Sequence, residues 1–246
     1  MEVFAETVPV KNDMHTKPLG HKSYGSIPHL PGSRRGTSDH GCHEGQYRIC
    51  CVKARDKYDR IIVQEKLDGS NVSIANVNGE IFALTRAGWP ATTSPFEQHH
   101  LFAMWVRNQY DRWGFIPKNH RVCGEWLALA HGTVYNLPHE PFVAFDIMEG
   151  MHRWPYDQVQ ALLLNQVVMP TTLHIGGPIP IDRAIELLGP AGFHGCVDGQ
   201  PEGVVYRVEC NGQVDFLAKY VRPDKEDGKY LPERSGKDAI WHWRPK

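Results

Sequence analysis

The chain has 246 residues, of which 41% are hydrophobic and seven are tryptophan, so it is long enough for one large domain or two small ones with a buried core. The formal net charge of −1 excludes a protein that coats nucleic acid by charge alone. The chain has no apolar run near the roughly 20 residues that span a bilayer, and its acidic start lacks a secretory pattern, so we expect a cytoplasmic protein that does not enter membranes.

The first segment, residues 1–58, is rich in proline and glycine. These residues interrupt every periodic pattern, which predicts a loop-rich arm packed on the core. The arm carries a small cluster made of Cys42, His43, Cys50 and Cys51. Adjacent cysteines would point to opposite faces of a strand, and the six cysteines of the chain form no C-x-x-C pair. We therefore favour buried free thiols over a zinc site or disulfides.

Strands and turns follow the arm. Residues 60–65 form a β-branched run that leads directly into Lys66, and residues 71–75 alternate as a second strand. The pair Asn78-Gly79 has type I′ turn chemistry and predicts a return strand over residues 80–85. Lys66 is thus predicted at the end of a strand.

A helix is predicted next. Ser94 and Glu97 have the spacing of a capping box with proline between them, and the helix should end before Gly114. The remaining predicted elements are strands through Val122 to Trp126 and over 142–148, helices over 156–166 and 182–188, and a hairpin of 203–209 with 214–220 around Asn211-Gly212.

These elements predict an α+β module with curved antiparallel sheets and flanking helices. We expect a catalytic core over residues 59–222 and a short carboxy-terminal tail over 223–246. That tail is too short for an oligonucleotide-binding barrel.

Lys66 lies in an unusual setting. It is flanked by Glu65 and Asp68 and followed by Gly69, which would let a phosphate approach closely. A lysine becomes a nucleophile when its surroundings favour the neutral amine or a metal assists its deprotonation. Taken alone, this run is equally consistent with a surface lysine beside a β-turn.

Six blocks together are more specific. In chain order they are Lys66 to Asn71, Thr85 to Gly88, Cys123 to Trp126, Phe142 to Ile147, Glu202 to Arg207, and Leu217 to Arg222. The chain resembles the covalent nucleotidyltransferase superfamily of ATP-dependent RNA ligases, DNA ligases and mRNA capping enzymes, in which these blocks occur in this order. The resemblance implies the nucleotidyltransferase fold, an ATP-grasp-like ligase domain.

The resemblance also implies roles. Lys66 would form a phosphoramidate with AMP, and Arg86 would contact the ribose or a substrate phosphate. Glu125 would bind the adenosine ribose, and Phe145 would stack on adenine. Phe145 could instead be a core residue and Arg86 a hairpin-edge residue, whereas a buried Glu125 without a ligand would be costly.

Glu202 would help to hold Mg²⁺ or Mn²⁺, and Lys219 would contact the α-phosphate. The last block departs from the common pattern of two basic residues one apart. Either Lys219 is the first of the pair and Arg222 has replaced the second, or Lys219 is the second and Leu217 has replaced the first. The set expected to contact ATP is Glu65, Lys66, Asp68, Gly69, Asn71, Arg86, Glu125, Phe145, Glu202 and Lys219, with Lys66, Lys219 and Arg86 catalytic.

Within the superfamily, the short tail and the runs 24–34 and 218–222 look like phage and bacterial RNA ligases. The resemblance then implies an enzyme that uses ATP to join RNA 5′-phosphate and 3′-hydroxyl ends through a lysyl-AMP intermediate. A minimal DNA nick ligase and a nucleotide- or RNA-end-binding module without catalysis are the alternatives. Basic residues expected to grip the strand are Arg34, Arg35, Arg107, Arg112 and Arg222.

Overall fold

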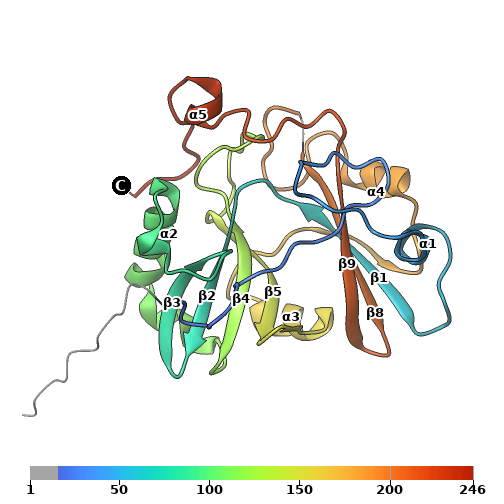
Figure 1. Ribbon diagram of the computed structural model, residues 1–246, viewed down its shortest axis with the longest axis horizontal. Coiled ribbons are helices and arrows are strands. Elements are labelled where there is room, and N and C mark those ends of the chain that lie inside the picture. Colours follow the sequence, from blue (N-terminus) through green and yellow to red (C-terminus); the bar gives the residue numbers. More distant parts are fainter. Residues whose placement is uncertain (1–15, 200, 246) are drawn as a thin grey trace, which may run out of the picture.

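A computed structural model describes residues 16–199 and 201–245, in which two antiparallel sheets lie side by side (Figure 1). The first sheet has the order β7-β1-β8-β9, with bounds β1 Asp59–Lys66, β7 Thr172–Gly176, β8 Gly203–Cys210 and β9 Gln213–Val221. The second has the order β3-β2-β4-β5-β6, with bounds β2 Ser70–Val77, β3 Glu80–Thr85, β4 His120–Trp126, β5 Phe142–Glu149 and β6 His152–Arg153.

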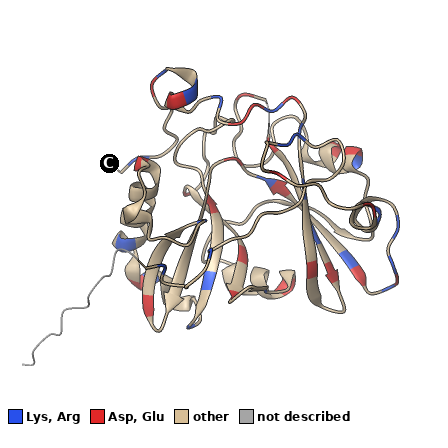
Figure 2. Ribbon diagram, in the orientation of Figure 1, with Lys and Arg blue, Asp and Glu red and all other residues tan. Residues whose placement is uncertain are grey.

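Helices flank both sheets. Their bounds are α1 Glu44–Cys51, α2 Glu97–Asn108, α3 Tyr156–Leu163, α4 Ile181–Leu188 and α5 Pro232–Ser235, with 3-10 turns η1 Ala91–Thr93 and η2 Tyr110–Phe115. This arrangement confirms the predicted α+β class. Basic and acidic residues are interspersed along the strands and loops (Figure 2).

Each sheet has its own core. Helices α1 and α4 cover the first sheet, where they bury Ile61 and Val63 of β1. Helix α2 covers the second sheet, and its Phe102 and Trp105 pack on Trp126 of β4 with ring centroids 5.3 and 5.4 Å apart. Helices thus cover one face of each sheet and leave the space between the two sheets for a site.

The predicted hairpins are confirmed. Asn78 and Gly79 adopt φ of 56° and 100°, and Asn211 and Gly212 adopt 51° and 72°, as the primed turns require. Strand β7 was not predicted, since its five residues are only partly buried and lack a clear alternating pattern.

The capping box predicted at Ser94 and Glu97 is wrong. Helix α2 begins at Glu97 without a side-chain cap. Ser94 Oγ instead accepts from the Phe96 N–H and pairs with His99 Nδ1 at 2.6 Å. Glu97 pairs with Arg244 of the tail at 2.6 Å. Ser94 therefore takes nearby partners other than the cap, and Glu97 takes a distant one.

Helix α1 corrects the prediction that the arm is irregular throughout. His43 caps it, because its Nδ1 accepts from the Gln46 N–H at 3.2 Å. Cys50 and Cys51 lie on this helix, so the expectation that they point to opposite faces of a strand is wrong, and both pack into the core of the first sheet. All six cysteines are free thiols.

The arm crosses from one sheet to the other (Figure 1). Ser23 donates its N–H to the Arg86 carbonyl beside β3 at 3.0 Å. Farther along, the Lys219 N–H of β9 donates to Pro28 and the Leu30 N–H donates back to Lys219, at 2.9 and 2.8 Å. The arm thereby links the two sheets.

The tail also returns to the core. Ala130 donates its N–H to Ile240 at 2.9 Å, and His242 donates to Ala128 at 2.8 Å. Among the described residues, 16–199 and 201–245, no helix is long and apolar enough to cross a membrane.

Candidate active site

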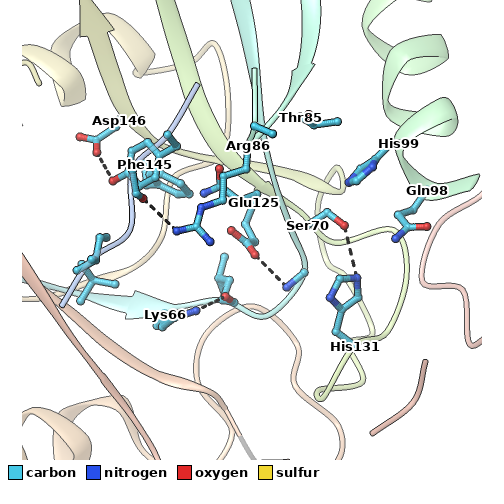
Figure 3. A pocket seen from close by; sticks show the side chains of 18 of the residues that line it. Lys66, Ser70, Thr85, Arg86, Gln98, His99, Glu125, His131, Phe145 and Asp146 are labelled. Atoms are coloured by element: carbon cyan, nitrogen blue, oxygen red, sulfur yellow. Dashed lines mark hydrogen bonds between the residues drawn. The ribbon is translucent and has the colours of Figure 1, made fainter. Parts of the chain in front are cut away.

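A cavity of about 820 Å³ is lined by both sheets, the arm, helix α2 and the tail (Figure 3). Eight of the ten residues expected to contact ATP line it, namely Glu65, Lys66, Gly69, Asn71, Arg86, Glu125, Phe145 and Lys219. Asp68 and Glu202 are not among the lining residues, but Glu202 accepts from Lys66 and Asp68 lies in the turn that follows it. Blocks far apart in the sequence are thus brought together.

Lys66 ends β1 and is paired in register with Gly203, the first residue of β8. Its Nζ donates to Glu202 Oε2 at 2.6 Å and to the Leu67 carbonyl at 3.3 Å. Gly203 has a φ of +155°, and a Cβ there would collide with the Tyr220 carbonyl. Glycine at position 203 therefore lets β8 and β9 approach each other closely beside Lys66 and Glu202.

The turn after Lys66 is held by contacts on both sides of the cavity wall. Gly69 donates its N–H to Glu125 Oε1 at 3.1 Å. Asp68 Oδ2 accepts from the Gly132 N–H at 2.9 Å and lies 3.5 Å from the buried Lys225 Nζ of the tail. The Asp68 N–H donates to Tyr135 Oη at 3.1 Å. Asp68 therefore positions the turn.

Arg86 and Phe145 occupy the upper wall in Figure 3. Arg86 donates to the Gly25 carbonyl of the arm at 3.2 Å. The ring of Phe145 meets that of Tyr24 edge-on at 5.2 Å, and Tyr24 Oη donates to Asp146 at 2.6 Å. The half-buried Phe145 ring thus has one side held by the arm while it lines the cavity.

The last block is clarified by β9. Leu217 and Lys219 line the cavity, and Val221 is buried. Arg222 pairs with Asp224 at 3.1 Å and is not among the lining residues. This geometry favours the alternative in which Lys219 is the second residue of the pair and Leu217 has replaced the first basic residue.

Charge is concentrated around Lys66. Burial lowers the pKa of Lys66, but the carboxylates of Glu202, Glu125 and Asp68 outweigh burial and raise that pKa above its ordinary value. Burial raises the pKa of Glu125 to about 7 and also raises that of Glu202. Burial and the nearby Lys66 lower the pKa of Lys219. At rest Lys66 is therefore an ammonium ion paired with a carboxylate.

Glu65 faces away from Lys66, as neighbouring residues of a strand do. Its carboxylate accepts from the Phe193 N–H at 2.9 Å, and burial raises its pKa to about 7. Its other oxygen, Oε1, is buried without a hydrogen bond. The expected contact between the Glu65 side chain and ATP is not supported by this orientation.

Several residues of the site were not predicted. Tyr24 and Ile27 come from the arm, Arg207 from β8, and Glu233 from α5. Tyr24 and Ile27 fall in the arm segment 24–34 that looks like RNA ligases, and Arg207 ends the fifth block. Nothing in the sequence marks Glu233, which reaches the site through long-range folding.

Three of the five basic residues expected to bind RNA form ion pairs with carboxylates. Arg34 pairs with Asp227 at 3.1 Å, and Arg112 pairs with Glu140 at 2.7 Å. Arg222 is paired as described above. Exposed pairs of this kind are weak, so phosphate could displace them.

Comparisons with known proteins agree with this geometry. The RNA ligase family profile matches residues 59–221, about two thirds of the chain. A Naegleria gruberi RNA ligase variant, solved with ATP and Mn, shares the fold with a TM-score of 0.52 and 16% identity, covering 85% of this chain and 62% of that one.

Two other matches are shorter. An archaeal ATP-dependent RNA ligase is 24% identical, with a TM-score of 0.40, and covers 66% of this chain and 42% of that one. An uncharacterized protein of Methanocaldococcus jannaschii is 27% identical over 94 residues, 37% of this chain and 20% of that protein. The chain thus spans from a fifth to about three fifths of these relatives. On the match of the family profile, the chain belongs to the RNA ligase family.

Proposed function

We propose that this protein is an ATP-dependent RNA ligase that joins a 5′-phosphate end to a 3′-hydroxyl end through AMP bound to Lys66. One observation carries the proposal. Lys66 ends β1 in a cavity that also presents Arg86, Glu125 and Lys219, and its Nζ lies 2.6 Å from Glu202. Family membership supports the reaction class, and the Naegleria relative solved with ATP and Mn supports the substrate. Because the reaction consumes ATP and RNA, we place it in the cytoplasm as part of the same proposal.

In the first step, neutral Lys66 Nζ attacks the α-phosphorus of ATP. A bond from nitrogen to phosphorus forms as the bond from the α-phosphorus to the bridging oxygen breaks, and pyrophosphate leaves with that electron pair. Arg86 and Lys219 are placed to offset charge on the α-phosphate. Lys66 must first lose the proton that its carboxylate neighbours stabilise.

The site suits a divalent cation. Glu202 and Glu125 offer carboxylate oxygens, and Asn71 Oδ1 is buried without a hydrogen bond. Hard oxygens of this kind are what Mg²⁺ and Mn²⁺ prefer. Glu202 would hold such an ion, assisted by these neighbours. When bound, the ion supplies positive charge that favours the neutral form of Lys66 and offsets charge on the phosphates.

The later steps use the same lysine. A 5′-phosphate oxygen of RNA attacks the AMP phosphorus, and Lys66 leaves and regains a proton. A 3′-hydroxyl then attacks the RNA phosphorus, AMP leaves, and the hydroxyl proton passes to solvent. Lys66 is thereby ready for another cycle.

Covalent labelling tests the proposal. Wild type incubated with Mg²⁺ and ATP labelled at the α-phosphate should retain acid-stable label, whereas Lys66→Ala should retain none. Lys53→Ala, which changes an exposed lysine outside the cavity, should label like wild type. An unlabelled wild type, or equal labelling of Lys66→Ala, would refute the function.

Substrate preference needs a second assay. Labelled protein should transfer AMP to a 5′-phosphorylated oligoribonucleotide and seal it to a 3′-ribose end. More efficient sealing of 3′-deoxyribose ends on a nicked duplex would instead identify a DNA nick ligase. Binding of ATP with neither AMP labelling nor sealing would indicate a nucleotide- or RNA-end-binding module without catalysis.

A further inference from the structure

The cavity has two chemically different ends (Figure 3). Phe145, which Tyr24 contacts edge-on, lies at one end on the same side as Lys66, and Arg86 and Glu125 lie between it and the other end. The other end, which we call the histidine end, presents Gln98, His99 and His131 (Figure 3). Three further lining residues belong to it, because the Phe96 ring meets that of His99 edge-on at 5.8 Å, the Glu233 carboxylate interacts with His131, and the Trp89 carbonyl accepts from Thr85 beside them. AMP with its base near Phe145 and its phosphate at Lys66 would leave the histidine end open.

Aromatic side chains dominate the rim of the histidine end. Trp89 is 39% exposed and Phe96 is 49% exposed, although both are large and apolar. Solvent-exposed aromatic rings beside a reactive centre are suited to stacking with nucleobases. This end of the cavity therefore matches a nucleoside in chemistry and position.

Charge at the histidine end disfavours phosphate. Among the described lining residues, the permanent cations belong to the rest of the cavity, namely Lys66, Arg86, Arg207 and Lys219, and Glu233 adds a carboxylate to this end. Burial lowers the pKa of His99 to about 4 and lowers that of His131, so both rings are neutral near pH 7. Lys17 lies at the rim, with its Nζ 5.1 Å from the centroid of the Trp89 ring, and is not a lining residue, so a phosphate would find no permanent cation among the described residues that line this end.

Hydroxyl groups, in contrast, would find partners. His131 Nε2 lies 3.4 Å from Ser70 Oγ, and Ser70 directly follows Gly69 in the turn after Lys66. Buried Gln98 and exposed Glu233 add oxygens that accept hydrogen bonds. A ribose with free 2′- and 3′-hydroxyls carries two donors for such acceptors.

We infer that the histidine end binds the 3′-terminal nucleoside of the RNA strand that supplies the attacking hydroxyl. The inference rests on the proposed ligase function and adds the subsite for the second strand. That strand end is the one without a terminal phosphate, which fits a pocket with neutral histidines and a carboxylate. Its base would stack on Phe96 or Trp89, and its ribose would face Ser70 and His131.

The sealing step can be measured separately from ATP use. The donor is an oligoribonucleotide already adenylated at its 5′ end and blocked at its 3′ end, and the acceptor is an oligoribonucleotide with a free 3′-hydroxyl. Phe96→Ala and His131→Ala should each raise the KM for the acceptor about tenfold, as the loss of a stacked or hydrogen-bonded contact predicts. Labelling of Lys66 by ATP should stay within about twofold of wild type.

Matched controls lie outside the cavity. Tyr58→Ala removes an aromatic ring that is 52% exposed, and His152→Ala removes an exposed histidine of β6. Both should leave the acceptor KM unchanged. Phe96→Tyr keeps an aromatic ring and should restore the wild-type KM, which separates stacking from damage to the fold.

Binding gives an independent readout. An acceptor with 2-aminopurine at its 3′ terminus should lose fluorescence on wild type through stacking, and less on Phe96→Ala. An unchanged acceptor KM and unchanged quenching in both Phe96→Ala and His131→Ala would overturn the inference. So would an equal loss of Lys66 labelling, because the histidine end would then serve ATP. A wild type that takes up no label refutes the proposed function instead.

Discussion

Lys66 and Glu125 are charged groups held away from water, and each changes the protonation of the other. The ammonium of Lys66 is stabilised by three carboxylates, while burial makes the carboxylate of Glu125 harder to ionise. This balance keeps the free lysine unreactive. In the proposed reaction, nucleophilic attack depends on ATP arriving with a divalent cation, because the cation competes with the Lys66 ammonium for the same carboxylates.

The raised pKa of Glu125 predicts a pH-dependent stability. Its folded-state pKa of about 7 exceeds the ordinary value near 4.5, so the folded state binds the proton more tightly and loses stability as pH rises from about 4.5 to 7. Glu125→Gln removes this penalty. We expect a gain on the order of 2–3 kcal/mol in the free energy of unfolding at pH 8, and under about 1 kcal/mol at pH 5.

Urea unfolding at the two pH values measures this difference. The control Glu80→Gln changes an exposed residue of β3 and should shift stability equally little at both. An equal gain for Glu125→Gln at pH 5 and pH 8 would show that Glu125 titrates normally.

At the scale of elements, the arm forms hydrogen bonds with both sheets. Beside β3, Gly88 lets the arm approach closely, because Gly88 has a φ of +87° and a Cβ there would collide with the His21 carbonyl. Farther along, the arm forms hydrogen bonds with β9 and places Tyr24 against Phe145. The wall of the nucleotide site therefore depends on a segment outside the six blocks.

Gly88→Ala should displace the arm at this point. We expect a loss of more than about 1 kcal/mol in stability and a several-fold higher KM for ATP in Lys66 labelling, because Tyr24 would no longer hold Phe145. Limited proteolysis should cut residues 16–30 faster. Gly114→Ala is the matched control, since Gly114 has open space and no positive φ. Unchanged protection of the arm would contradict this role.

Strands were predicted better than helix ends. Strand runs such as residues 60–65 alternate or are β-branched, and their turns contain Asn-Gly, so the signal is local. Helix starts depended on which hydrogen-bond partner a side chain takes. Ser94 forms a hydrogen bond with His99 instead of capping α2, and α1 begins after a histidine cap. The sequence pattern does not indicate which of two possible partners a side chain takes.

At the scale of the whole molecule, the tail completes the second core. Trp243 packs against that core and meets Trp126 edge-on at 5.4 Å, while His242 accepts from the Tyr135 N–H at 3.1 Å. Tyr135 in turn contacts Asp68 of the lysine turn. The division into an arm over 1–58, a core over 59–222 and a tail over 223–246 stays a prediction.

Trp243→Ala should therefore destabilise the protein. Loss of a partly buried tryptophan should cost about 2–3 kcal/mol and lower the Tm by about 5–10 °C in a chain of this size. Circular dichroism during heating measures the shift. Arg244→Ala, which breaks an exposed pair with Glu97, should change stability by less than about 1 kcal/mol. Equal Tm values for the two variants would mean that the tail does not contribute to the core.

The sequence by itself determined the α+β class, the hairpins and the protein family, because alternation, turn chemistry and ordered blocks are local signals. The blocks that indicate the family contain Lys66, Arg86, Glu125 and Phe145. The tertiary structure decided that Leu217 rather than Arg222 faces the cavity, since strand direction and pairing set which side chains point inward. It also decided that arm, tail and helix α2 contribute walls to that cavity. Contacts between distant segments leave no periodic trace in the chain, so only folding brings the histidine end to Lys66.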